Sequence, residues 1–84
     1  MNFEALVWER VGYRIQTFVP CKNTGIELQV KVIDYFGNAG EYHYIIRYGG
    51  LIIAKSNPIY KNELDAKSAA IMKLARIYRV ITES

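Results

Sequence analysis

The chain is poor in the residues that cross-link a fold or bind metals. Its 84 residues include one cysteine, one histidine and two prolines. A single cysteine cannot form an intramolecular disulfide, and one cysteine with one histidine cannot supply the four ligands of a protein-only zinc site. This composition fits a reducing compartment best. We therefore expect a chain with no metal and no other cofactor.

Long apolar runs are also missing. No segment approaches the roughly 20 apolar residues that a membrane helix requires. The start of the chain carries Glu4, where a secretory signal would carry basic residues. With 51% hydrophobic and 23% charged residues, the sequence is typical of one small globular domain spanning residues 1–84. We expect a soluble, cytoplasmic protein that does not contact a membrane.

No catalytic set can be read from the sequence. An alternating strand would place His43 and Glu41 on one face, but no nucleophile accompanies them. Cys21 stands beside Lys22, which can lower a thiol pKa, yet no catalytic partner is evident. The glycines do not have the spacing of a phosphate-binding or dinucleotide-binding loop. We therefore expect a protein that is not an enzyme.

The strongest pattern that is present is an amphipathic helix over Asn62–Ile81. Asn62 can cap this helix, and Glu63 and Asp65 lie in its first turn, where the helix dipole favours negative charge. Lys67 projects near the middle of the apolar stripe, so it must extend past a sheet edge or meet an anion. The apolar residues recur at three- and four-residue steps: Leu64, Ile71, Leu74, Ala75, Tyr78 and Ile81.

The chain before this helix reads as β-strands. Residues 3–11 fit either a helix or a strand, and their Val, Trp and Phe favour the strand slightly, with a turn at Glu9–Gly12. The sequence thus predicts an α+β fold, in which an antiparallel sheet of four to five strands packs on one C-terminal amphipathic helix. The clearest strands are Tyr13–Val19, Ile26–Tyr35 and Glu41–Tyr48, followed by one that ends before Asn57-Pro58.

Gly49-Gly50 predicts a two-residue hairpin, because both positions can adopt positive φ. This turn sets a register for the two strands that flank it. On one face it pairs Tyr48 with Leu51, Ile46 with Ile53 and Tyr44 with Lys55. On the other face it pairs Arg47 with Ile52, Ile45 with Ala54 and His43 with Ser56. The residues expected to meet the helix are Tyr48, Ile46, Leu51 and Ile53, which leaves Arg47 and His43 near solvent.

Positive charge is concentrated in the second half of the chain. The net charge is +3, made up of −1 over residues 1–42 and +4 over residues 43–84. On a helical wheel Lys73, Arg76 and Arg79 form a basic ridge opposite the apolar stripe. Such a ridge is typical of a polyanion-binding surface, although a solvated surface can carry the same excess. The residues that we expect to contact phosphates are Lys67, Lys73, Arg76 and Arg79, assisted by Arg47 from the sheet.

Aromatic residues accompany the cations of the predicted strands. Single-strand binders use aromatic faces for stacking and basic side chains for phosphates. Tyrosine is also an ordinary core residue of small sheets, and we expect Tyr48 and Tyr78 to be core. The strand residues in question are Tyr13, Tyr35, Tyr42, Tyr44 and Tyr48, with Arg14, Lys31, Arg47 and Lys55.

Two family resemblances point the same way. Ala66, Lys67, Ala69 and Ala70 match the Ala-Lys-x-Ala-Ala core in the last helix of double-stranded-RNA-binding domains. The paired lysines of that family would fall on Glu63 and Leu64. Residues 26–81 also resemble the sheet-plus-helix DNA-binding domains of phage integrases, in which a three-stranded sheet enters the major groove. These resemblances imply a nucleic-acid-binding module, such as a phage or mobile-element accessory protein.

A second class of function fits the same sequence. Exposed tyrosines and arginines can serve as anchors in a protein interface. The chain would then be a protein-interaction or inhibitor protein that covers a partner's site, and its partner would present an acidic surface. An unpaired edge of the sheet can also join two copies as a homodimer.

Overall fold

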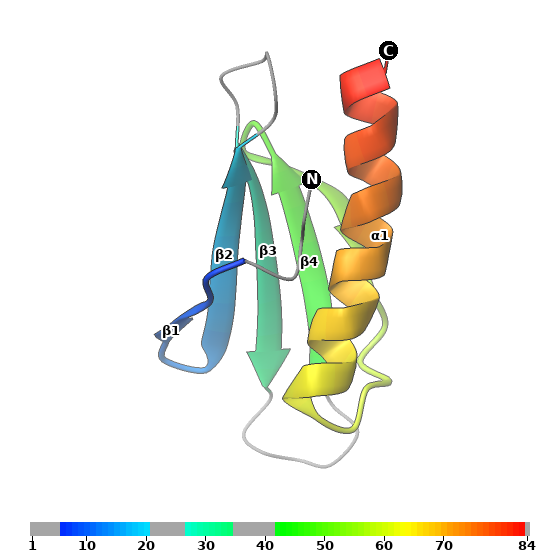
Figure 1. The fold of residues 1–84 in the computed structure, drawn as a ribbon. Coiled ribbons are helices and arrows are strands. Elements are labelled where there is room, and N and C mark those ends of the chain that lie inside the picture. The colour runs from blue at the N-terminus through cyan, green and yellow to red at the C-terminus, as the bar shows by residue number, and fades with distance from the viewer. Residues whose placement is uncertain (1–5, 21–26, 35–41, 84) are drawn as a thin grey trace.

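The computed structural model describes residues 6–20, 27–34 and 42–83. The strands form one antiparallel sheet in which each strand pairs with the next along the chain. Figure 1 shows α1 lying across one face of this sheet, over β4 and β3. The α+β prediction is therefore confirmed. The elements are β1 (Glu9–Val11), β2 (Arg14–Pro20), β3 (Glu27–Asp34), β4 (Tyr42–Tyr48), β5 (Leu51–Lys55) and α1 (Glu63–Glu83).

The ambiguous first segment is resolved in favour of a strand where it is described. Residues 6–8 are not helical, and β1 pairs with β2 around a turn at Gly12, whose φ is 63°. The predicted turn at Glu9–Gly12 is wrong, because residues 9–11 already belong to the sheet. Leu6 and Trp8 instead pack against the core. Residues 3–5 of the segment, Cys21, Tyr35 and Glu41 lie outside the described residues.

The C-terminal helix forms where the periodicity predicts it. Its cap is confirmed, since Asn62 Oδ1 accepts a hydrogen bond of 2.8 Å from the backbone N–H of Asp65. The helix meets the sheet through small residues, Ala66 and Ala70, which allow close approach, and through Leu74. Leu64, assigned by the periodicity to the apolar stripe, is 71% exposed. The buried core against which α1 packs contains Val19, Leu28, Val30, Tyr44 and Ile46.

The β4–β5 hairpin follows the predicted register for only two pairs. Gly49 and Gly50 have φ of 58° and 86°, and the pairs at the turn are those predicted. A bulge then intervenes, so that Ile46 faces Ala54 and Ile45 faces Lys55. The pairs predicted beyond the turn residues are therefore wrong. The extra residue is Ile53, and its side chain lies beside α1, whereas Leu51 is 72% exposed rather than packed on the helix.

The sheet has one covered face and one face that no described helix or strand covers. Alternation along the paired strands assigns every second residue to the second face, which we call the open face. His43 belongs to it by alternation, but it is 2% exposed, so the expectation that it lies near solvent is wrong. The open face consists of Arg14, Gln16, Phe18, Gln29, Lys31, Ile33, His43, Ile45, Arg47, Ile52 and Lys55, with Glu9, Val11 and Glu27 at its margins.

Candidate nucleic-acid interface

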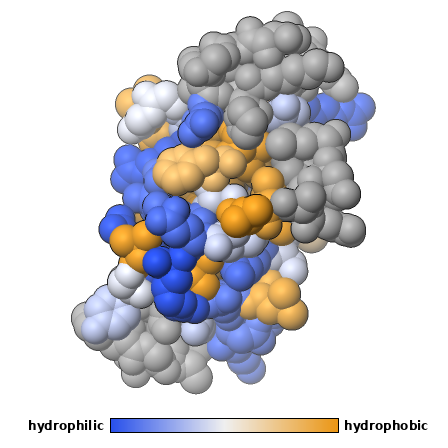
Figure 2. All heavy atoms as spheres, turned by 60° about the vertical axis from the view of Figure 1, so that its left-hand side comes forward, coloured by the Kyte–Doolittle hydropathy of each residue, from blue (hydrophilic) through white to orange (hydrophobic). Residues whose placement is uncertain are grey.

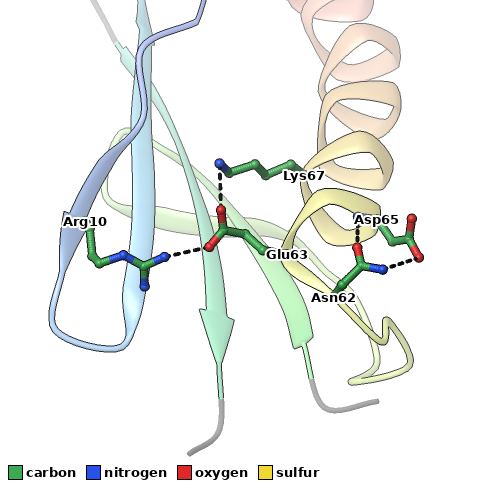
Figure 3. A network of polar contacts seen from close by, with 5 residues as sticks. All are labelled: Arg10, Asn62, Glu63, Asp65 and Lys67. Carbon is green, nitrogen blue, oxygen red and sulfur yellow. Dashed lines mark hydrogen bonds and ion pairs between the residues drawn. The ribbon is translucent and has the colours of Figure 1, made fainter. Parts of the chain in front are cut away.

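Lys67 is held by two partners at the start of α1. Its Nζ lies 3.0 Å from Glu63 Oε2 (Figure 3). The same atom lies 5.2 Å from the centre of the Trp8 ring. Arg10 of β1 reaches the same carboxylate, with 2.7 Å between its Nη2 and Glu63 Oε1. Of the two alternatives for Lys67, extension past the sheet edge is the one that the sequence favours, and the structure instead shows an ion pair with Glu63. Its ammonium group is engaged within the protein and its side chain is only 21% exposed, which makes it a poor phosphate ligand.

This network joins β1 to the helix. It connects segments that are distant along the chain, because Arg10 and Glu63 are 53 residues apart in sequence. Figure 2 looks at the molecule from the side of β1 and shows hydrophilic and hydrophobic residues interspersed over the described surface. The ion pairs of Glu63 therefore engage Arg10 and Lys67 in joining β1 to α1.

The other helix cations do not share a surface with Lys67. Lys73 and Arg76 line a groove together with Ile53 of β5, on the opposite flank of α1 from Trp8. They therefore border the apolar stripe rather than standing opposite it. Arg79 is exposed and is not among the residues that line the groove. Arg47 belongs to the open face, with the sheet between it and α1. The five residues expected to bind phosphates thus lie on separate surfaces.

A different set of cations is brought together by strand pairing. The register places Arg14 of β2, Lys31 of β3 and Arg47 of β4 on a diagonal across three neighbouring strands of the open face. Diagonal neighbours in a sheet are about 7–8 Å apart, so the three charges span about 15 Å. Successive rungs of this face are Arg14–Ile33–His43, Gln16–Lys31–Ile45 and Phe18–Gln29–Arg47.

The electrostatics of the open face reflect this crowding. Burial lowers the pKa of Lys31, and the charges of Arg14 and Arg47 lower it further. The pKa of His43 is also lowered, first by burial and then by Lys55. Among the described residues, the ion pairs are those of Glu63 with Arg10 and Lys67, so no acid is paired with these cations. The open face therefore carries three neighbouring cations that form no ion pair with a described acid, with Glu9 and Glu27 at its margins.

Arg47 is the most constrained of the three diagonal cations. Its Nη1 donates a hydrogen bond of 3.4 Å to the carbonyl oxygen of Gly50. Its Nε is buried and has no hydrogen-bond partner in the described part of the protein. A buried guanidinium N–H without an acceptor is costly. Arg47 is thus the one predicted site residue that lies within the crowded cation set.

Apolar and amide side chains complete the open face. Phe18 is 46% exposed and shares a rung with Gln29 and Arg47. The amides of Gln29 and Gln16 are joined by a hydrogen bond of 3.2 Å. The exposed aromatic residue of this face is thus a phenylalanine rather than one of the tyrosines.

The strand tyrosines expected to stack on bases are placed elsewhere. Tyr44 and Tyr48 lie on the helix side of the sheet, where Tyr44 belongs to the core cluster and Tyr48 packs against it. Burial raises the pKa of Tyr44, with a further contribution from Tyr60, whereas the charge of Arg76 opposes the shift. Tyr78 also packs against the core, but Tyr48 and Tyr78 are only partly buried, so they border the core that was predicted to contain them.

Comparison with known proteins adds no family to these observations. No protein-family model, curated protein or solved structure matches the chain. In the described part of the protein, no three histidine, cysteine, aspartate or glutamate side chains gather where they could hold a metal ion. The described helix is not apolar enough over its length to cross a membrane.

Proposed function

We propose that the chain is a small, non-enzymatic module that binds nucleic acid through the open face of its sheet. The observation that carries this proposal is the diagonal of Arg14, Lys31 and Arg47 on three adjacent strands, with no described acid paired to it. Phosphates are the ligands that such a row of cations suits, because each contact releases a condensed counterion.

The side chains around the diagonal supply contacts to bases. The exposed ring of Phe18 offers a stacking surface, and base–aromatic stacking is worth about 1–3 kcal/mol per base. The amides of Gln16 and Gln29 are of the type that pairs with adenine, and an arginine fork is of the type that pairs with guanine. The same face thus combines phosphate contacts with groups that can read a sequence.

The position of the helix supports binding in which the open face of the sheet, and not α1, contacts the nucleic acid. Because α1 covers the opposite side, the open face can approach a groove of duplex DNA without obstruction from the described elements. This arrangement is similar to the one implied by the phage-integrase resemblance. A double-stranded-RNA-binding domain would need a first helix, which residues 6–11 do not form. Origin in a phage or mobile element stays a prediction.

Self-association through a sheet edge has less support. β1 is three residues long, and β5 carries a bulge. Short edge strands and bulges are the features by which proteins discourage pairing with a second copy. The homodimer therefore stays a prediction, and the open face is the better candidate for function.

The test is the salt dependence of binding to labelled duplex DNA, single-stranded DNA and duplex RNA. Three phosphate contacts predict a slope of about −2 to −3 for the logarithm of the association constant against that of the salt concentration. Lys31→Gln should reduce the magnitude of this slope by about one and weaken binding to all sequences alike. Its melting temperature should stay the same or rise, because it relieves repulsion within the diagonal.

Two variants serve as controls. Lys61→Gln removes an exposed charge that precedes α1 and belongs to neither the open face nor the groove, so it should leave the slope unchanged. Lys73→Gln removes a helix charge from the other side of the sheet and should also leave it unchanged. No binding at low salt would overturn the proposal, and a slope altered by Lys73→Gln but not by Lys31→Gln would move the interface to α1.

A further inference from the structure

A second binding site lies on the covered side of the sheet, between α1 and the β4–β5 hairpin. It is a groove of about 450 Å³, within the usual range for ligand sites. Its lining combines aliphatic side chains with two cations at its helical border: Tyr48, Ile53, Lys73, Arg76, Ile77 and Val80.

The bulge in β5 is what shapes this groove. The extra residue, Ile53, lies on the helix side although it is 41% exposed, and Val80 on the facing turn of α1 is 69% exposed. Large aliphatic side chains this exposed on both walls leave the groove unfilled by the described chain. An apolar group entering between them would be removed from water, which is favourable.

The charges of the groove select the kind of occupant. Lys73 and Arg76 are exposed, stand three residues apart on α1 and form no ion pair with any described acid. A second copy of the chain would bring a net charge of +3 and the same two cations, so like charges would oppose it. Charge complementarity therefore favours an acidic occupant.

The length of the groove limits the occupant's size. From Lys73 to Val80 the helix advances by about 10 Å, which an extended chain covers in about three residues. We propose that this groove binds a short acidic segment of a partner protein, in which one bulky apolar side chain enters between Ile53 and Val80 and flanking carboxylates meet Lys73 and Arg76. This site is separate from the open face.

The probe for this proposal is a five-residue peptide with one leucine and one phenylalanine between acidic residues. In a titration followed by amide chemical shifts, the largest changes should fall on residues that line the groove. Lys73→Glu should weaken binding of the peptide by about tenfold. Lys61→Glu, which makes the same charge change outside the groove, should weaken it by less than twofold. A peptide of the same apolar residues between lysines should bind the wild-type chain at least tenfold more weakly.

Each other outcome overturns the proposal. Absence of binding at millimolar peptide, or equal weakening by Lys73→Glu and Lys61→Glu, removes the groove as a specific site. A dimer that Val80→Asp dissociates would identify a second copy as the occupant. If Lys73→Glu weakens the binding of nucleic acid and not that of the peptide, Lys73 and Arg76 belong to the nucleic-acid interface. Loss of nucleic-acid binding in Lys31→Gln alone leaves the peptide result unaffected, so the two proposals fail separately.

Discussion

His43 is a neutral, buried side chain in a sheet face that otherwise carries several cations. Burial and the nearby Lys55 both disfavour its protonated form, so its pKa in the folded protein lies below that of the unfolded chain. The single histidine therefore adds no charge to the open face at neutral pH. Its burial instead makes the stability of the fold sensitive to acid.

The direction of this pH dependence follows from linkage. As pH falls below about 6.5, the unfolded chain binds a proton that the folded chain resists, so the free energy of unfolding should decrease from pH 7.5 to pH 5.5. Urea denaturation at intermediate pH values measures this slope. His43→Gln should remove this pH dependence of the free energy of unfolding, and Lys55→Gln should reduce it. A wild-type slope equal to that of His43→Gln would contradict the assignment.

At the scale of elements, β1 is joined to α1 by the ion pair of Arg10 with Glu63. Glu63 bridges Arg10 and Lys67; the side chains of Glu63 and Lys67 are 31% and 21% exposed, whereas that of Arg10 is 60% exposed. Glu63→Gln should lower the free energy of unfolding by about 1 kcal/mol at low salt and by less at 1 M NaCl, because ion pairs are screened.

Asp65→Asn is the matched control for that prediction. Like Glu63→Gln, it removes an acid from the first turn of α1 and with it a favourable interaction with the helix dipole. Unlike Glu63→Gln, it breaks no ion pair between described residues. Chemical denaturation of both variants then isolates the bridge. Equal losses of stability would show that Glu63 acts through the helix dipole alone.

The elements themselves could largely be predicted from the sequence, because periodicity records which side of each element is buried. The helix over Asn62–Ile81 is found at Glu63–Glu83, and β2 to β4 are found within one residue of their predicted bounds. The bulge at Ile53 could not be predicted, since it changes the backbone pairing without changing the alternation of apolar residues. The groove that depends on it was therefore missed as well.

At the scale of the whole molecule, the diagonal of Arg14, Lys31 and Arg47 could not be predicted, because the sequence does not give the register between strands. Arg14, Lys31 and Arg47 stand on predicted strands, but only the paired register shows that they are diagonal neighbours. A helical wheel predicts one basic ridge from Lys73, Arg76 and Arg79, because it treats the helix without its neighbours in the fold. Packing against β3, β4 and the Trp8 segment divides the helix cations among different neighbours.

The two proposed sites lie on opposite sides of one sheet, and this predicts independent binding. Saturating acidic peptide should change the dissociation constant for nucleic acid by less than about twofold at 0.15 M salt. At that ionic strength charges are screened over about 8 Å, and the sheet separates the two surfaces. Fluorescence anisotropy of labelled nucleic acid with added peptide measures the effect. Mutual displacement would show that both ligands use one surface.

The order of strands in the sheet also governs how the chain folds during synthesis. Because each strand pairs with the one made just before it, the sheet can assemble stepwise as the chain leaves the ribosome. The 21-residue α1, which covers its apolar face, is made only afterwards. At typical translation rates the synthesis of α1 takes about 1–4 s, so the strands that have already left the ribosome lack their helical cover for at least that time.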